Sequence, residues 1–224
     1  MEAAQPSAEA IFSTLRIESE RAHAGTGGVL WGGTRCGLSL LDYLRAQGLG
    51  GARVLSLGCG LGALELVCAC LGAHVTATDL EMVRPLFERN AQGNAAALAG
   101  RKGVGAVAFE PLDWRAPPPA AVLAAGPFAY ALASDCVFWP ELFEPLIGTM
   151  AALSAAQAPR PLHFFLLIEP RSPRELDFFV ALRAAGFTYA KLDERHSQHL
   201  AGAVSSACAI FWCCHTARQA ATAP

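Results

Sequence analysis

Short apolar runs along the chain alternate with longer segments in which apolar residues recur every three or four positions. Runs of the first kind predict buried strands, and segments of the second kind predict helices. The predicted strands are residues 53–57, 74–78, 104–109, 128–134, 162–168, 187–192 and 207–214, and the predicted helices are residues 38–46, 61–71, 82–98, 141–156 and 173–185.

The order of these elements predicts an α/β fold. Strands and helices alternate through the first five strands, which favours a parallel, doubly wound sheet with helices on both faces. Residues 196–204 are predicted to form a loop, so the last two strands are expected to pair as an antiparallel edge. Residues 115–126 contain Pro117-Pro118-Pro119 and are expected to form a loop with at most a short helix.

No linker divides the chain into two parts, so we expect one folded domain over residues 26–216. Residues 1–25 mix short apolar stretches with charges and are expected to form a weakly ordered arm, with an early strand at most. Residues 217–224 form the expected C-terminal tail.

Composition limits the classes of function. Hydrophobic residues make up 53% of the chain and charged residues 16%, which is typical of a protein with a buried core. The net charge of −2 gives no general attraction to nucleic acid or to anionic membranes, so neither partner is expected. The longest apolar stretch is interrupted by glycines and Glu65, which makes it a poor membrane span, and the first ten residues do not resemble a signal peptide.

The cysteines and histidines show no spacing typical of a metal site, so no metal is expected. The cysteines lie mostly within apolar runs, and we expect them to be free, buried thiols in a reducing compartment, either the cytoplasm or the nucleus. The eight cysteines are residues 36, 59, 68, 70, 136, 208, 213 and 214. Arg171, Arg174 and Arg195 are expected to be solvated side chains.

The strongest local motif is a glycine-rich turn between the first predicted strand and the following helix. Its sequence from residue 58 is Gly58-Cys59-Gly60-Leu61-Gly62, and Asp79 ends the next strand. Glycines allow a sharp turn and bring a ligand close to bare backbone amides. A carboxylate at Asp79 can accept both hydroxyls of a ribose. The motif therefore predicts a nucleoside-containing cofactor.

This turn alone does not separate two cofactor classes. Gly58, Gly60 and Ala63 also fit the G-x-G-x-x-[GA] pattern of dinucleotide-binding proteins. An NAD(P) oxidoreductase would need a Tyr-x-x-x-Lys pair or a separate substrate domain. Neither is found, because Tyr130 and Tyr189 have no lysine four positions later.

Two later motifs favour S-adenosylmethionine. Asp113-Trp114 follows the third strand, where a carboxylate can accept from an adenine amino group and an indole can stack on the ring; the alternative is a tryptophan that covers the domain edge. Asp135 and Phe138 follow the fourth strand, and ligands bind beyond the carboxyl ends of such strands. A carboxylate beside an aromatic ring can orient an amine, although Asp135 could equally be a helix cap or a satisfied carboxylate.

Together with Trp31, these motifs resemble the seven-strand, S-adenosylmethionine-dependent protein-lysine methyltransferases with a D-x-x-[FY] motif, and within them the methyltransferase-like 21 group. The resemblance runs from about residue 28 to residue 214. The matching segments are Gly28 to Trp31, Leu57 to Gly62, Asp79, Leu112 to Trp114, Ala133 to Asp135, and Asp135 to Phe138.

The resemblance implies a mostly parallel seven-strand sheet with an antiparallel last strand, S-adenosylmethionine as cofactor, and methylation of a lysine of a protein substrate. Separately, the chain is expected to be a monomer. The resemblance implies cofactor-binding roles for Trp31, Gly58, Cys59, Gly60, Gly62, Asp79, Asp113, Trp114 and Ser134. It also implies catalytic roles for Asp135, which would orient the incoming amine, and for Phe138, which would wall the channel with Trp139.

Two positions depart from the family pattern. Family members usually have an acid two residues before the first motif glycine, where it helps to orient the loop and the sulfonium end of the cofactor, and this chain has Ser56. Phe138 stands where tyrosine is commoner. The alternatives are the same fold acting on a small molecule, an RNA base or another protein side chain, and a non-catalytic scaffold. Asp135 in place of asparagine argues against RNA and glutamine acceptors, whereas Ser56 favours the scaffold.

Overall fold

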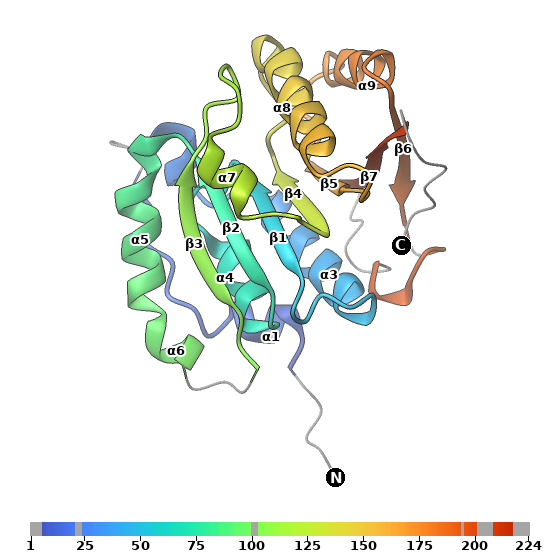
Figure 1. Ribbon diagram of the computed structural model, residues 1–224. Coiled ribbons are helices and arrows are strands. Elements are labelled where there is room, and N and C mark those ends of the chain that lie inside the picture. The colour runs from blue at the N-terminus through green and yellow to red at the C-terminus, as the bar shows by residue number, and fades with distance from the viewer. Residues whose placement is uncertain (1–5, 21–23, 100–102, 194, 201–207, 217–224) are drawn as a thin grey trace.

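The computed structural model describes residues 6–20, 24–99, 103–193, 195–200 and 208–216. Their strands form one sheet in the order β3-β2-β1-β4-β5-β7-β6 (Figure 1). Strands β1 to β5 are parallel, and β7 lies antiparallel between β5 and β6. The strands are β1 (Arg53–Leu57), β2 (His74–Asp79), β3 (Ala106–Pro111), β4 (Tyr130–Ser134), β5 (His163–Ile168), β6 (Phe187–Leu192) and β7 (Ala209–His215).

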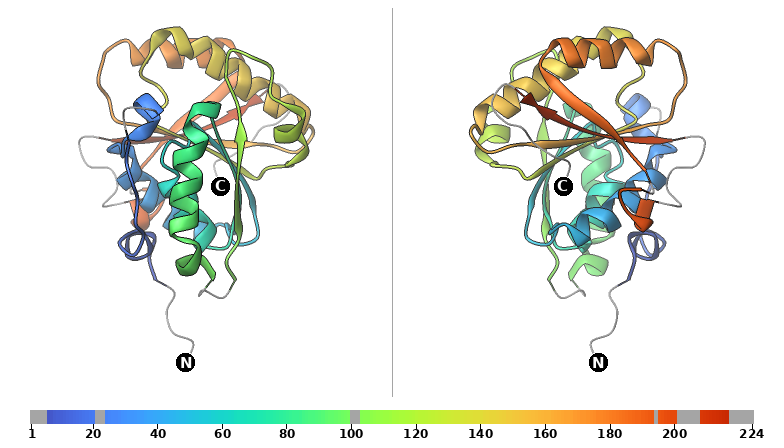
Figure 2. Two further views of the ribbon diagram at one scale, coloured as in Figure 1. Left: turned by 90° about the vertical axis from the view of Figure 1, so that its left-hand side faces the viewer. Right: turned by 90° about the vertical axis from the view of Figure 1, so that its right-hand side faces the viewer.

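Helices cover both faces of this sheet, with α8 and α9 on one side and α3 on the other (Figure 2). No helix among the described residues combines the length and the apolar character needed to cross a bilayer. The α-helices are α1 (Ala8–Phe12), α3 (Gly33–Ala46), α4 (Ala63–Cys70), α5 (Arg84–Gly93), α6 (Ala95–Ala99), α7 (Ala120–Ala124), α8 (Phe143–Ala156) and α9 (Glu175–Ala184). Short 3-10 turns span Gly25–Gly28, Glu81–Val83, Pro140–Leu142 and Gln198–Leu200.

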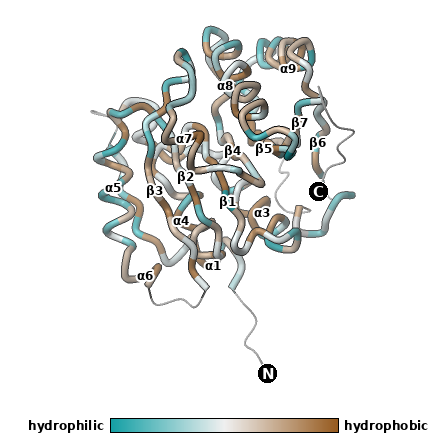
Figure 3. Tube along the Cα trace, in the orientation of Figure 1, coloured by the Kyte–Doolittle hydropathy of each residue, from teal (hydrophilic) through white to brown (hydrophobic). Residues whose placement is uncertain are grey.

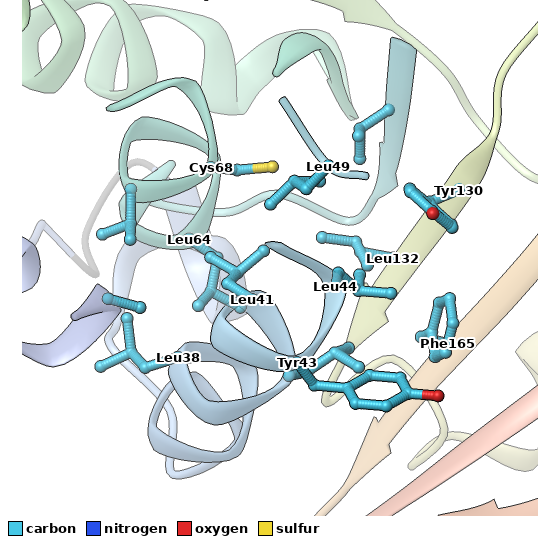
Figure 4. Packing of buried hydrophobic residues seen from close by; sticks show 14 of the residues in the cluster. Leu38, Leu41, Tyr43, Leu44, Leu49, Leu64, Cys68, Tyr130, Leu132 and Phe165 are labelled. Atoms are coloured by element: carbon cyan, nitrogen blue, oxygen red, sulfur yellow. The ribbon is translucent and has the colours of Figure 1, made fainter. Parts of the chain in front are cut away.

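The two faces of the sheet bury separate cores, because successive side chains of a strand point to opposite sides. Val54 belongs to the core cluster that also holds Leu41 and Leu44 of α3, two residues labelled in Figure 4. The next residue, Leu55, belongs to a separate cluster with Leu146 of α8. Apolar residues therefore gather in the central strands, and hydrophilic residues lie along α5 and α9 (Figure 3).

The predicted fold is confirmed, with differences at the ends of elements. The predicted helix over residues 82–98 is divided into a 3-10 turn, α5 and α6. Asn94 ends α5, and its buried amide donates to the carbonyl oxygens of Arg16 and Asn90 at 2.8 Å. The predicted helix at residue 38 already begins at Gly33, and the proline-containing loop holds the short α7.

The N-terminal segment packs against the domain, so the expectation of a weakly ordered arm with an early strand is wrong for its described part. Helix α1 is capped by Ser7, and Ile11 is 1% exposed. The Asp42 carboxylate accepts from the Ala8 amide at 3.0 Å. Asn90 and Asn94 then hold the backbone of residues 16–18 against α5. The predicted tail, residues 217–224, lies outside the described residues.

One pair of cysteines differs from the expectation of free thiols. The structure joins Cys36 of α3 to Cys208, just before β7, as a disulfide with 6.6 Å between the Cα atoms. The other six cysteines are buried thiols outside any disulfide, as expected. These are residues 59, 68, 70, 136, 213 and 214.

We predict that Asn90→Ala lowers the free energy of unfolding by about 2 to 4 kcal/mol, because it removes several buried hydrogen bonds at once. The Asn90 amide donates to the carbonyl oxygens of Glu18 and Leu61, and its oxygen accepts from the Glu18 amide. Urea unfolding measures the change. Gln92→Ala, at an exposed position of the same helix, serves as the control. Equal losses in both variants would contradict this role of Asn90.

Candidate functional site

A pocket opens at the carboxyl ends of β1, β2 and β4, where open α/β sheets bind ligands. Parallel pairing brings these strand ends together, because Leu57 pairs with Thr78 and Ser56 pairs with Leu132. The predicted site residues that line the pocket are Trp31, Gly58, Cys59, Gly60, Asp79, Asp113, Trp114, Ser134, Asp135 and Phe138. The remaining predicted residue, Gly62, is not among the lining residues and is the N-cap of α4.

The turn requires glycine for two reasons, namely its backbone conformation and the close approach of neighbouring atoms. Gly58, Gly60 and Gly62 have φ values of 72°, 51° and 79°, in the left-handed region that favours glycine. A Cβ atom at Gly58 would lie 2.7 Å from the Cys136 sulfur. The amides of Gly58 and Cys59 both donate to the Thr78 carbonyl oxygen at 2.9 Å, which fixes the turn against β2.

Asp79 faces the glycine turn from the end of β2. Its carboxylate accepts from the Gly60 amide at 2.9 Å and from the Leu80 amide at 2.8 Å. Burial raises the pKa of Asp79, and the two amide hydrogen bonds oppose that rise. Since a carboxylate offers about four acceptor positions, Asp79 can still accept from the hydroxyls of a ligand.

Trp31 and Trp114 lie on the pocket wall. The Trp31 indole donates to the Thr26 carbonyl oxygen at 2.9 Å. Trp114 is partly buried against the core cluster that contains Leu55 and Leu146, and it borders Gly58. The same ring therefore covers the domain edge and faces the pocket. Its neighbour Asp113 is exposed and pairs with Arg115 at 3.8 Å.

Asp135 connects three elements through one buried carboxylate. Its side chain is 3% exposed, and its φ of 54° is left-handed. Oδ2 accepts from the Gly33 amide, the first of α3, at 2.7 Å. Oδ1 accepts from the Arg171 guanidinium at 3.0 Å and from the Glu169 amide at 3.3 Å. The alternative that Asp135 is a satisfied carboxylate is therefore confirmed, and the same carboxylate lines the pocket.

Arg171 is exposed, as predicted, but its guanidinium also contacts the pocket wall. It is paired with Asp135, lies 3.4 Å from Glu169, and places its guanidinium 4.7 Å from the centre of the Trp31 ring. The sequence signal was available, because residues 169–171 follow β5 and must reach the same sheet edge as Asp135. Arg174 and Arg195 are exposed, as predicted.

Phe138 and Trp139 border the pocket beyond Asp135. Their ring centroids are 4.8 Å apart, and Trp139 is 45% exposed. Two further exposed apolar side chains that line the pocket are Leu30 and Leu80, at 44% and 40%. The mouth of the pocket therefore exposes apolar side chains beside the exposed Asp113 and Arg115 pair, whereas the wall behind it holds buried acids.

Glu65, in the first turn of α4, is a pocket residue that motif analysis missed. It is 4% exposed, and its Oε1 accepts from the Ser56 hydroxyl at 2.5 Å. Burial raises the pKa of Glu65 to about 7. With Asp79, Asp113 and Asp135 it gives the pocket four acids against one lining cation, Arg115. No group of metal-binding side chains occurs within the described ranges.

The chain matches one protein family and is similar in sequence to two named lysine methyltransferases. The family described as lysine methyltransferase matches residues 12–185. The chain is 26% identical to protein N-lysine methyltransferase METTL21A of Xenopus tropicalis over 146 residues, which cover 64% of this chain and 63% of that protein. It is 30% identical to EEF1A lysine methyltransferase 3 of Mus musculus over 118 residues, 52% of this chain and 47% of that protein. The chain thus spans less than two thirds of these relatives.

Solved structures share the fold at low sequence identity. Magnesium protoporphyrin IX methyltransferase from Synechocystis PCC 6803, solved with bound SAH, has a TM-score of 0.52 and 18% identity, covering 87% of this chain and 91% of that one. A putative RNA methyltransferase from Pyrococcus horikoshii has a TM-score of 0.54 and 13% identity, covering 93% and 95%. Both confirm the predicted Rossmann-like architecture.

We predict that Arg171→Ala destabilises the protein by about 1 to 2 kcal/mol, because it leaves the buried Asp135 carboxylate without its cation. The expected loss of stability is smaller than for a fully buried ion pair, because the Arg171 side chain is 32% exposed. Arg174→Ala, nearby and exposed, is expected to change stability by less than about 0.5 kcal/mol. Chemical unfolding of both variants tests this; indistinguishable midpoints would mean that the ion pair contributes nothing.

Proposed function

Because the chain belongs to the lysine methyltransferase family, we propose that it transfers the methyl group of S-adenosylmethionine to a lysine side chain of a protein substrate. The observation that carries this proposal is the acidic pocket at the glycine turn. S-adenosylmethionine bears a sulfonium, an ammonium and a carboxylate, so its net charge is positive and complements the acids on the wall.

The same charge distribution argues against NAD(P). A dinucleotide places its pyrophosphate at the glycine turn and the N-terminus of the following helix. Here that helix is α4, and its first turn holds Glu65 as a buried, pocket-lining acid. An ionised carboxylate there would repel a pyrophosphate, whereas it would attract a cationic ligand.

The residues present fit S-adenosylmethionine part by part. The glycine turn lets the ligand approach the backbone, and Asp79 has acceptor positions for the ribose hydroxyls. Trp114 offers an aromatic face on the same wall, and Ser134 and Trp31 border the pocket toward Asp135. When bound, the cofactor supplies an electrophilic methyl group on its sulfonium.

Asp135 would receive and orient the lysine. Three hydrogen bonds occupy its carboxylate, which leaves about one of four acceptor positions for an incoming ammonium. The lysine must lose a proton before attack, since its ordinary pKa is about 10.4. A carboxylate alone would raise that pKa, so Phe138 and Trp139 must oppose it by excluding water. The proton then passes to solvent through the open mouth.

A protein substrate is supported by the apolar side chains exposed at the mouth of the pocket. Leu30, Leu80 and Trp139 are exposed there, and such side chains are typical of surfaces that contact another protein. The two relatives named above are protein-lysine methyltransferases by name. A peptide could therefore lie across the mouth while its lysine enters toward Asp135.

We expect Asp79→Asn to weaken S-adenosylmethionine binding at least about tenfold, equivalent to about 1.4 kcal/mol, because a neutral amide replaces a charged acceptor of the ribose hydroxyls. Isothermal titration calorimetry measures the affinity. Asp177→Asn, an exposed acid on α9, should bind like the wild type. Unchanged affinity in a folded Asp79→Asn variant would place the ribose elsewhere.

Asp135→Asn should lower kcat/KM for lysine methylation by at least about 100-fold, since an amide cannot hold an ammonium as a charged partner. S-adenosylmethionine affinity should change much less. The measurement is transfer of labelled methyl groups to proteins of a cell extract, followed by kinetics on the labelled substrate. Methylation at the wild-type rate would remove Asp135 from the reaction, and cofactor binding without any turnover in the wild type would favour a scaffold.

A further inference from the structure

Glu65 is a buried acid on the pocket wall that no described cation neutralises. Its partners are the Ser56 hydroxyl and its own backbone amide, and the charged group that acts on it is Asp79, another acid. Burial of a carboxylate without a cation is unfavourable, and an apolar residue of similar size would avoid that cost. A group kept in this state at a ligand pocket indicates a charge that arrives with the ligand.

Resting on the function proposed above, we infer that Glu65 is the residue that recognises the ammonium group of the methionine part of the cofactor. The ammonium donates hydrogen bonds and the sulfonium does not, so a carboxylate selects the ammonium by hydrogen bonding as well as by charge. Glu65 thereby becomes a positioning residue, because it fixes the methionine end from which the methyl group is transferred.

The other acids of the pocket have different assignments. Asp135 is already paired with Arg171, and exposed Asp113 is paired with Arg115. Asp79 is directed to the amides of Gly60 and Leu80 at the end of β2. Glu65 remains as the buried acid on the side of the pocket formed by β1 and α4.

The position of Glu65 also accounts for Ser56. The family usually has an acid where this chain has Ser56, at the end of β1. Here the Ser56 hydroxyl contacts a carboxylate that comes from α4 instead. The acid reaches the end of β1 from the next element of the chain, so the serine does not indicate a decayed site.

Binding of the ligand through Glu65 should depend on pH. Since the pKa of Glu65 is raised to about 7, part of the population is protonated near neutral pH and must release a proton to bind a cation. Affinity for the ligand should therefore increase as the pH rises through about 7. The titratable groups around Glu65 are Asp79 of β2, Cys59 of the turn, Cys68 of α4 and Cys136 after β4. Burial raises the pKa of each of these cysteines well above this window.

The test compares two ligands that differ in the amino-acid part. S-adenosylhomocysteine has the ammonium, whereas 5′-methylthioadenosine keeps the nucleoside and the thioether but lacks the amino-acid part. Glu65→Gln should weaken the first about tenfold and the second less than about twofold, because only the first presents the cation. Calorimetry in two buffers of different ionisation enthalpy should show proton release at pH 7 for the wild type and none for Glu65→Gln.

A swap variant separates charge from local packing. In Ser56→Glu/Glu65→Ala the acid moves back to β1, and affinity for S-adenosylhomocysteine should return toward the wild-type value. Equal weakening of both ligands in Glu65→Gln, or no weakening of either, would overturn the inference. If Glu65→Gln does not fold, the swap variant and the proton release of the wild type decide the question. A folded wild type that binds neither S-adenosylmethionine nor S-adenosylhomocysteine would instead contradict the proposed function.

Discussion

A carboxylate buried in a pocket wall must be compensated by hydrogen-bond donors or by a cation. This chain places two buried acids, Asp135 and Glu65, and the half-buried Asp79 at the carboxyl edge of its sheet and compensates each differently. Asp135 has a cation and two amides, Asp79 has two amides, and Glu65 has one hydroxyl and its own amide. The charge that remains uncompensated is negative, so the pocket suits a cationic ligand.

The backbone makes this arrangement possible. Parallel pairing brings the ends of β1, β2 and β4 together, and left-handed glycines turn the chain sharply into α4. Gly33 serves a similar purpose at the start of α3, where a Cβ atom would overlap Asp135 and lie 2.8 Å from the Ser134 hydroxyl. Glycine is therefore needed at this position because the backbone amide lies so close to a carboxylate.

Sequence patterns predicted the features that depend on neighbours along the chain. The strand ends, the glycine turn and the acid of β2 follow from local periodicity and spacing, and they lie together as predicted. Pairings between distant segments were not predictable in the same way. Arg171 meets Asp135 across 36 positions, and Asn90 meets Glu18 across 72 positions. Glu65 was hidden for another reason, because it lies within an apolar helix whose pattern predicts only core residues.

We infer that the charge of the pocket selects a cationic nucleoside cofactor. Calorimetric titration of the wild-type protein with S-adenosylmethionine and, in parallel, with NAD tests this selectivity most directly. We predict micromolar binding of S-adenosylmethionine and no detectable binding of NAD at millimolar concentration, a difference of at least about 4 kcal/mol. Binding of NAD as tight as that of S-adenosylmethionine would contradict this inference.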